Sequence, residues 1–376
     1  GACGRPTGVK GLILSGGAGT RLRPITHTSA KQLVPVANKP ILFYGIEDMA
    51  RAGIEEIGIV VGETRDEIVA AVGDGSRFGV RVTYLPQAEP LGLAHAVLIA
   101  ADFLGGDDFV MYLGDNLLRQ GIGTFVEAFE RDRRAAASPA LGAEVDAPSA
   151  QILLAHVADP ERFGVAELNG SGEVVRLVEK PPVPPSDLAL VGVYLFDRSI
   201  HEAVRSIRPS ARGELEITDA IQWLIDHGRR VRHEVVDGWW IDTGKLAPLL
   251  EGNRLILETI TSRVDGTVDG DSRIEGRVVI EEGATLINST VRGPAIVGRD
   301  TVVRDSYIGP YTSVYFGCEI VNTEIEHSVV LEQSRIEGVP RMQDSLIGKQ
   351  VVVTRSEARP KATRLMLGDH SVVDLE

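Results

Sequence analysis

An apolar residue recurs almost every six positions in the C-terminal part of the chain, and this spacing constrains the fold more than any other feature. Six residues is neither the period of a helix nor the alternation of an amphipathic strand. It is typical of a parallel β-helix, in which three short strands form a coil and one apolar residue per strand fills the interior. A β-sandwich with coincidental spacing is the alternative. The residues that we assign to the interior are Val268, Ile274, Ile280, Leu286, Val291, Ile296, Val302, Ile308, Val314, Ile320, Ile325, Leu331, Ile336, Met342, Ile347 and Val353.

Short apolar runs alternate with amphipathic helical stretches before this repeat. This rhythm predicts an α/β domain with a Rossmann-like, mostly parallel sheet that is covered by helices on both faces. Ligands then bind outside the carboxyl ends of the strands. The predicted strands are 9–14, 56–61, 80–85, 108–113, 151–156 and 174–179, and the predicted helices are 40–52, 64–72, 93–103 and 217–227.

Three further segments complete the predicted domain organisation. Residues 133–150 are rich in Ala, Pro and Ser, and we expect a surface insertion there. We place the domain boundary after the helix-like stretch 246–260, so the α/β domain covers 9–260 and the β-helix domain covers 261–376. Residues 1–8 are expected to be a disordered lead-in.

Composition excludes several classes of function. The 376 residues carry a net charge of −14, which disfavours partners such as nucleic acid or an anionic membrane surface. No apolar run approaches the roughly 20 residues that span a bilayer, and the N-terminus lacks an apolar signal core. Cys3 and Cys318 are too few for a disulfide framework or a zinc site, so we expect free thiols in the cytoplasm. An anionic small substrate then requires basic residues that gather locally.

A glycine-rich segment follows the first predicted strand directly. Its glycines allow positive φ angles and a close approach of the backbone to a ligand, and successive N–H groups can then bind phosphate oxygens. A purely structural turn is the alternative reading of such glycines alone. Arg21 adds a permanent positive charge beside them, and Lys31 adds a second cation nearby. We assign nucleotide binding here to Leu14, Gly16, Gly17, Gly19, Thr20 and Arg21.

The motifs GGAGTRL at 16–22 and KQLVP at 31–35 resemble those of the sugar-1-phosphate nucleotidyltransferases. Within that family they are most similar to the glucose-1-phosphate thymidylyltransferases, whose long form carries a C-terminal left-handed β-helix. The resemblance therefore extends over essentially the whole chain. Further motifs of the same family follow in order: LGLAHA at 91–96, LGDN at 113–116, ERFGV at 161–165, EKP at 179–181, SARGELEITD at 210–219 and WWIDTG at 239–244.

The resemblance implies a reaction and a set of site residues. The expected reaction joins glucose 1-phosphate to the nucleotidyl group of dTTP, or of UTP, with Mg²⁺ as the cofactor. Either Asp115 or Asp242 alone fits a turn residue, but together they offer the hard oxygen ligands that suit Mg²⁺ shared with a triphosphate. Arg21, Lys31 and Lys180 complete the catalytic set. The base and ribose are assigned to Gln32, Gln87 and Gly92, and the sugar phosphate to Asn116, Gly164, Glu179, Lys180, Leu190 and Arg212.

Direct in-line attack of the sugar phosphate on the α-phosphorus needs no protein nucleophile. Three alternatives remain beside this one: another base or sugar, a catalytically silent regulatory subunit, and a bifunctional acyltransferase whose base is His327 or His370. We expect the β-helix to serve assembly or regulation, in a homo-oligomer for which a tetramer is favoured.

Overall fold

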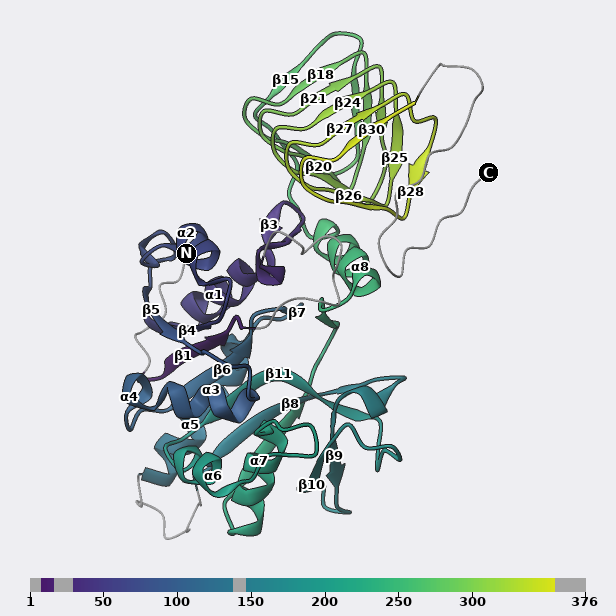
Figure 1. The fold of residues 1–376 in the computed structure, drawn as a ribbon. Coiled ribbons are helices and arrows are strands. Elements are labelled where there is room, and N and C mark those ends of the chain that lie inside the picture. Colours follow the sequence, from purple (N-terminus) through teal and green to yellow (C-terminus); the bar gives the residue numbers. More distant parts are fainter. Residues whose placement is uncertain (1–7, 17–29, 138–146, 356–376) are drawn as a thin grey trace. The chain divides into compact units, whose positions relative to one another are not determined.

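The computed structural model describes residues 8–16, 30–137 and 147–355, and the chain divides into two compact units (Figure 1). Of the described residues, the first unit contains 8–16, 30–33 and 41–243, and the second contains Val34–Pro40 and 244–355. The chain therefore leaves the first unit for one short hairpin and then returns to it. No described helix combines the length and the apolar character needed to cross a membrane.

The first unit is built on a nine-stranded mixed sheet in the order β10-β9-β11-β6-β1-β4-β5, with β8 paired to β11 and β12 paired to β8. The strands are β1 (Lys10–Leu14), β4 (Glu56–Val61), β5 (Arg81–Pro86), β6 (Phe109–Leu113), β8 (Ala150–His156), β9 (Gly164–Leu168), β10 (Val174–Glu179), β11 (Leu188–Phe196) and β12 (Val231–Val235). A separate pair is formed by β7 (Asn116–Leu118) and β13 (Trp240–Asp242).

The helices of the first unit lie on both faces of this sheet, which confirms the predicted α/β class. They are α1 (Ile41–Arg51), α2 (Arg65–Val72), α3 (Leu93–Ile99), α4 (Ala101–Leu104), α5 (Gly123–Ala137), α6 (Ile200–Ser206) and α7 (Ile217–Asp226). Strands β5, β4, β1 and β6 are mutually parallel, as the sequence pattern predicts. Strand β11 runs antiparallel to β6, so the complete sheet is mixed.

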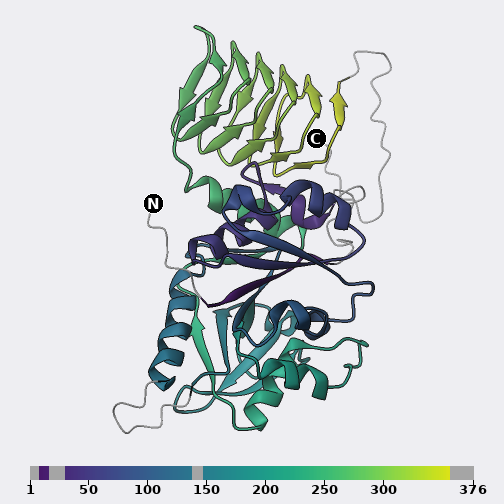
Figure 2. The same cartoon turned by 90° about the vertical axis from the view of Figure 1, so that its left-hand side faces the viewer.

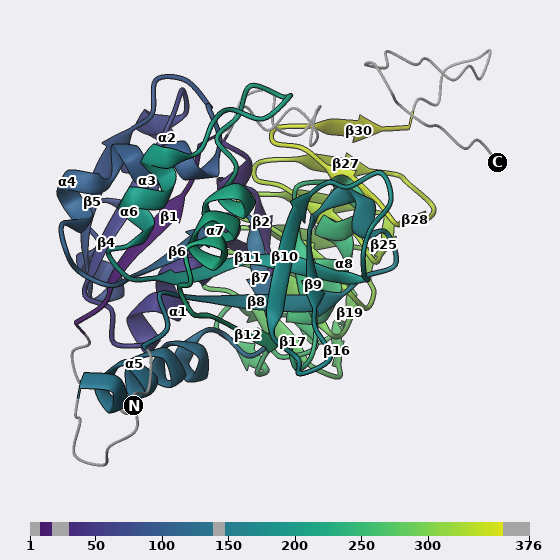
Figure 3. The same cartoon turned by 90° about the horizontal axis from the view of Figure 1, so that it is seen from below.

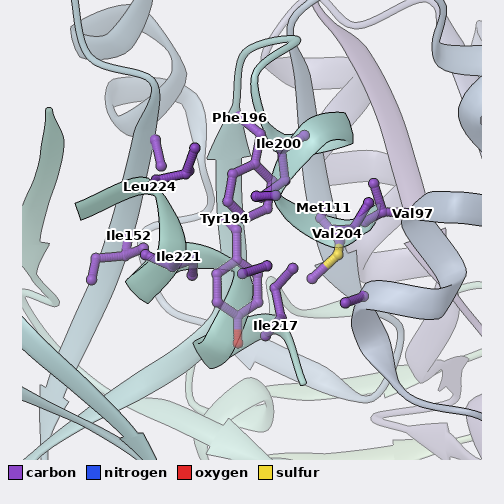
Figure 4. Close-up of a cluster of buried hydrophobic side chains, with 14 of the residues drawn as sticks. Val97, Met111, Ile152, Tyr194, Phe196, Ile200, Val204, Ile217, Ile221 and Leu224 are labelled. Atoms are coloured by element: carbon purple, nitrogen blue, oxygen red, sulfur yellow. The ribbon is translucent and has the colours of Figure 1, made fainter. Parts of the chain in front are cut away.

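Two apolar cores form because neighbouring residues of a strand point to opposite faces. Leu12 of β1 packs with α3, α6 and α7, together with Tyr194 and Phe196 of β11 (Figure 4). Ile13, the next residue, packs on the other face with Tyr112 and with α1, α2 and α5. Figure 3 shows α3, α6 and α7 gathered over the same part of the sheet.

The expected surface insertion at 133–150 is wrong for its first and last residues. Helix α5 continues to Ala137, and β8 begins at Ala150. Arg133 fixes the end of α5, because its guanidinium forms ion pairs with Asp108 at 2.6 Å and with Asp197 at 3.1 Å. Residues 138–146 lie outside the described residues.

The second unit contains a left-handed parallel β-helix of three stacked sheets (Figure 2). The first sheet is β14 (Arg263–Val264), β17 (Val278–Ile280), β20 (Ala295–Val297), β23 (Thr312–Val314), β26 (Val329–Val330) and β29 (Leu346–Ile347). The second is β15 (Thr267–Val268), β18 (Thr285–Ile287), β21 (Val302–Arg304), β24 (Glu319–Val321), β27 (Arg335–Glu337) and β30 (Val352–Thr354). The third is β16 (Arg273–Glu275), β19 (Thr290–Arg292), β22 (Tyr307–Ile308), β25 (Glu324–Glu326) and β28 (Met342–Gln343).

Most of the predicted interior positions of the β-helix are confirmed, and three are wrong by one residue. The interior residues there are Val297, Val303 and Val330 in place of Ile296, Val302 and Leu331. The error has a local cause. The five-residue steps fall at two corners of the coil. Three lie between the second and third sheets, where Asn288, Asp305 and Asn322 adopt positive φ angles of 43°, 48° and 47°. Two lie between the third and first sheets, where His327 and Asp344 adopt φ angles of 42° and 51°. Asn and Asp tolerate this conformation better than other residues with a side chain.

A hairpin and a helix pack with the β-helix inside the second unit. They are β2 (Pro35–Val36), β3 (Lys39–Pro40) and α8 (Leu246–Leu257). Asn253 of α8 is fully buried and its Oδ1 accepts hydrogen bonds from the Ala37 backbone N–H and the Ser313 hydroxyl, both at 2.8 Å. Its Nδ2 donates to the Tyr311 carbonyl at 3.3 Å. One buried amide therefore joins the hairpin, the helix and a coil of the β-helix.

We predict that Asn253→Ala destabilises the second unit by about 2–4 kcal/mol, because it leaves a buried N–H and a buried carbonyl without partners. Ser313→Ala removes only one of the three bonds, and we expect a loss of about 1 kcal/mol. Thermal and urea unfolding of the full chain, followed by circular dichroism, measures both. Equal midpoints for the wild type and Asn253→Ala would contradict the role given to this amide.

Candidate active site

The carboxyl ends of four parallel strands meet at one edge of the sheet, and the predicted nucleotide-binding residues lie there. Leu14 ends β1, Gln87 follows β5, and Asp115 follows β6. Backbone hydrogen bonds hold these strand ends together. The Gly114 N–H donates to the Leu14 carbonyl at 3.0 Å, and the Gln87 N–H donates to the Val61 carbonyl at 2.8 Å.

Gly16 lies between two predicted nucleotide-binding amides. The Gln32 Nε2 donates to the Gly16 carbonyl at 3.3 Å, and a Cβ at Gly16 would lie 3.2 Å from the Gln87 Oε1. Gln32 is 1% exposed, and its Oε1 has no hydrogen-bond partner within the described residues. A buried acceptor without a partner is costly, so a ligand that donates a hydrogen bond is favoured beside it.

Lys31 and Asp115 form an ion pair at the same edge. The Lys31 Nζ contacts the Asp115 Oδ2, and the Asn116 Nδ2 donates to the Asp115 Oδ1 at 3.1 Å. The backbone of Asp115 is held as well, since its carbonyl accepts hydrogen bonds from the Thr243 N–H at 3.0 Å and the Thr243 hydroxyl at 2.7 Å. Asp242 lies opposite Asn116 in the antiparallel pair of β13 and β7. Asp115 thus immediately precedes β7, and Asp242 ends β13, the strand that pairs with β7.

Asn116 supports this arrangement with its whole side chain. Its Oδ1 accepts hydrogen bonds from the Trp240 Nε1 at 2.6 Å and from the Gly192 N–H at 3.2 Å, and its Nδ2 donates to Asp115. The side chain is buried, and a Cβ at Gly192 would lie only 2.7 Å from its Oδ1. Asn116 therefore fixes Asp115 relative to β11 and β13, and its contact with the sugar phosphate stays a prediction.

The predicted sugar-binding residues form a second cluster along β9, β10 and β11. Glu179 ends β10 and pairs with Gly164. A Cβ at Gly164 would lie 3.2 Å from the Glu179 Oε2 and 3.5 Å from a methyl group of Leu190. Lys180, the next residue, has a φ of 42°, and its Nζ lies 3.9 Å from the Glu179 Oε1.

Arg212 is held by a buried carboxylate that sequence reasoning did not identify. Glu216 is 4% exposed and accepts hydrogen bonds from the Arg212 Nε at 3.2 Å and the Arg212 Nη2 at 2.9 Å. The Nη1 atom makes no hydrogen bond within the described part of the chain, and the Nη2 lies 3.9 Å from the Glu179 Oε1. Burial, and then the charge of Glu216, raises the pKa of Glu179 above its usual value. The Glu179 carboxylate therefore takes up a proton more readily than an ordinary glutamate does.

The nucleotide and sugar clusters are linked through the protein backbone. The Leu215 N–H donates to the Leu91 carbonyl at 2.8 Å, and the Ala94 N–H donates to the Leu215 carbonyl at 3.0 Å. A Cβ at Gly92 would lie 2.7 Å from the Leu215 nitrogen, so only glycine fits there with its φ of 110°. The segment that carries Gly92 is thus fastened to the segment that carries Arg212 and Glu216.

Four of the predicted nucleotide-binding residues are not placed. Gly17, Gly19, Thr20 and Arg21 lie outside the described residues.

The sequence alternative of an acyltransferase base falls on His327 and His370. His370 lies outside the described residues, and the His327 Nδ1 contacts the Asp344 carboxylate. The His327 ring also packs edge-on against Tyr311, which is the contact of a residue packed into the coil. Cys318 is free and buried, and burial raises the pKa of its thiol to about 11. An inert, packed thiol of this kind agrees with the predicted free thiol.

The donor set of the site can be compared with the needs of a divalent cation. The described residues contain no group of three or more His, Cys, Asp or Glu side chains that can hold a metal ion. Asp115, in the turn before β7, and Asp242, at the end of the paired strand β13, provide two hard oxygen donors. This set fits Mg²⁺, which is commonly bound by one or two carboxylates while water and substrate phosphates supply the other ligands.

Comparison with known proteins assigns the chain to a family. The nucleotidyl transferase family model matches residues 10–259. A glucose-1-phosphate thymidylyltransferase from Streptomyces griseus is 58% identical over 363 residues, which are 96% of this chain and 98% of that protein. One from Streptomyces antibioticus is 55% identical over 368 residues, which are 98% of this chain and 100% of that protein.

A solved structure supports the same assignment for the first part of the chain. It is a provisionally assigned glucose-1-phosphate thymidylyltransferase from Bacillus anthracis in complex with a sucrose. The two share 35% sequence identity with a TM-score of 0.60, over 68% of this chain and 98% of that chain. The chain therefore belongs to the nucleotidyl transferase family.

Proposed function

We propose that the protein transfers the thymidylyl group of dTTP to glucose 1-phosphate and so forms dTDP-glucose and pyrophosphate. The observation that carries this proposal is the identity of 58% and 55% with two glucose-1-phosphate thymidylyltransferases along nearly the whole chain. The described geometry agrees with it, because amides and cations that suit a nucleotide lie at one strand edge and cations that suit a sugar phosphate lie beside β9 to β11.

The reaction is an in-line displacement at the α-phosphorus. A phosphate oxygen of glucose 1-phosphate forms the new bond to this phosphorus, and the bond to the β-phosphate oxygen breaks as pyrophosphate leaves. A phosphate monoester with a second pKa of about 6 is already ionised near neutral pH, so no general base is required. Catalysis then consists of positioning two anions and stabilising the charge that develops.

The cations of the site lower the repulsion between the two substrates. Lys180 and Arg212 hold the sugar phosphate, and Lys31 and Arg21 hold the triphosphate. Asp115 and Asp242 are the residues that would hold Mg²⁺, which when bound neutralises charge on the triphosphate. Asn116 keeps Asp115 in place through the three hydrogen bonds of its amide.

Base and ribose are recognised by amides. In this proposal Gln87 and the backbone of Gly92 face the pyrimidine. A pyrimidine with an N3–H and carbonyl groups is complementary to an amide, which accepts one hydrogen bond and donates another. Gln32 accepts a hydrogen bond from the ribose with its buried Oε1. Thymine and uracil differ by one methyl group, worth about 1–3 kcal/mol in an apolar pocket, so we propose that UTP is also used.

The remaining parts of the proposal concern assembly and location. We propose a cytoplasmic homo-oligomer, with a tetramer favoured, in which the β-helix contributes contacts between subunits. Light scattering of the purified full chain measures the mass of this assembly.

A panel of nucleotides and sugar phosphates tests the proposed function. Pyrophosphate release is measured with dTTP, UTP, ATP, GTP and CTP, each paired with glucose 1-phosphate and Mg²⁺. We expect dTTP to be used best and UTP next. Silence with every nucleotide would favour a regulatory subunit, although Lys31, Asp115, Lys180 and Asp242 are all present.

We predict that Asp115→Asn and Lys180→Ala each lower kcat/KM by roughly a hundredfold to a thousandfold. The first removes a carboxylate that would hold Mg²⁺, and the second removes a cation that holds the sugar phosphate. The thermal midpoint is expected to stay close to that of the wild type. Lys349→Ala is a matched control, since Lys349 is a lysine of the β-helix that pairs with Glu332 at 3.5 Å. Steady-state pyrophosphate release provides the rates. Wild-type rates in both site variants would contradict the roles given to Asp115 and Lys180.

We also predict that the contribution of Glu179 to kcat/KM for glucose 1-phosphate depends on pH. Because the pKa of Glu179 is raised, this carboxylate takes up its proton at a higher pH than an ordinary glutamate does, and it then accepts hydrogen bonds from sugar hydroxyls less well. The advantage of the wild type over Glu179→Gln in kcat/KM for glucose 1-phosphate should therefore shrink as the pH falls. Comparing the two enzymes at each pH cancels the titration of glucose 1-phosphate itself. A ratio that stays constant between about pH 8 and about pH 5 would contradict the prediction.

A further inference from the structure

A histidine that the proposed reaction does not use contacts one of the nucleotide-binding amides. Gln87 follows β5, and His95 lies in the first turn of α3. The Gln87 Nε2 and the His95 Nδ1 are 3.0 Å apart, which is a hydrogen bond.

The backbone on both sides of this contact is fixed. The Gln87 N–H is bonded to the Val61 carbonyl at 2.8 Å, and the Ala94 N–H is bonded to the Leu215 carbonyl at 3.0 Å. Gly92 is confined by Leu215, as described above. Helix α3 is further anchored in the core by Ala94, Ala96 and Val97, which are fully buried. The backbone that carries the His95 imidazole is therefore held in a fixed position next to Gln87.

The contact gives the Gln87 amide a direction. With the amide nitrogen of Gln87 against the ring, a neutral His95 that carries its proton on Nε2 accepts this hydrogen bond at Nδ1. The Gln87 Oε1 then points away from the ring, toward Gly16, where a Cβ would lie 3.2 Å from it. Turning the amide over would exchange acceptor and donor on the side that faces the ligand. For the His95 tautomer that carries its proton on Nε2, it would also place two lone pairs against each other.

We propose that His95 is a positioning residue that orients the Gln87 amide and thereby selects pyrimidines with an N3–H over cytosine. Thymine and uracil present a donor at N3 and acceptors at O2 and O4, whereas cytosine presents an acceptor at N3 and a donor at N4. An amide locked with its oxygen toward the ligand accepts from N3–H, and its second N–H donates to a carbonyl of the same base. The same locked amide leaves the N3 of cytosine facing an oxygen. The inference rests on the proposed function, in which Gln87 faces the base.

The test compares dUTP with dCTP, which differ only in the hydrogen-bonding edge of the base and carry the same triphosphate. The measured quantity is the ratio of kcat/KM for dUTP to that for dCTP, with glucose 1-phosphate and the full-length enzyme. This ratio does not depend on the fraction of enzyme that is folded. It also cancels any effect of a substituted charge on the phosphates.

Three substitutions of His95 test whether the residue at this position orients the Gln87 amide. His95→Leu removes the acceptor, and we expect the ratio to fall about five- to tenfold, as the loss of one hydrogen bond implies. His95→Lys offers only donors and favours the reversed amide, so the ratio should fall further while the rate with dCTP rises. His95→Asp offers only acceptors and should keep the ratio within about twofold of the wild type.

Unchanged ratios in both His95→Leu and His95→Lys would overturn the positioning role while leaving the proposed function intact. Gln87→Ala is the reference variant. It removes the amide itself, so it should abolish the preference for dUTP over dCTP that the His95 variants reduce. If Gln87→Ala keeps the wild-type ratio, Gln87 does not face the base, and the inference is overturned although the enzyme still uses dTTP. Absence of wild-type activity with every nucleotide would instead overturn the proposed function, and the inference with it.

Discussion

The candidate site depends on the buried amide of Asn116 more than on any other group. Its three hydrogen bonds join the end of β6 to β11 and β13, and one of them holds Asp115. A buried amide with all of these bonds made is stabilising, and the same amide with one partner removed is costly. The position of Asp115 is thus set by the fold itself. Asn116, which directly follows Asp115 in the sequence, is thus the residue that holds the Asp115 side chain in place.

Charge at the site is compensated locally in a protein whose net charge is −14. Lys31 is paired with Asp115, and Arg212 is surrounded by Glu179, Glu214 and Glu216. These pairs hold the cations in extended, preorganised positions before a phosphate binds, which reduces the reorganisation needed in the reaction. Each of these cations therefore lies next to at least one carboxylate of the same site.

The sequence predicts much of this molecule because several of its patterns are governed by strict geometry. A β-helix coil admits one apolar residue per strand, so the six-residue period identified it, and the three misassigned positions followed from corners that omit a residue. Strand β11 escaped notice because it is buried on both faces and its apolar run has no alternation. Helix α5 was not among the predicted helices, and its last residues were assigned to the insertion although alanine favours a helix. Glu216 and His95 lie inside recognised motifs. Their contacts with Arg212 and Gln87 depend on the directions of the side chains, which the spacing of the motifs alone does not reveal.

The hairpin held by Asn253 has a consequence for how such a chain can evolve. Residues 34–40 follow Lys31 and Gln32 after a single intervening residue, and they belong to the unit that contains the β-helix. The Asn38 side chain donates to the Val314 carbonyl at 2.7 Å, and Ala37 packs with Val279 and Ile296. Removal of the β-helix would expose the apolar contacts of Ala37 and leave the Asn38 side chain without this acceptor. A shortened chain without the C-terminal unit would therefore need a different sequence at residues 34–40, although these residues lie close to its start.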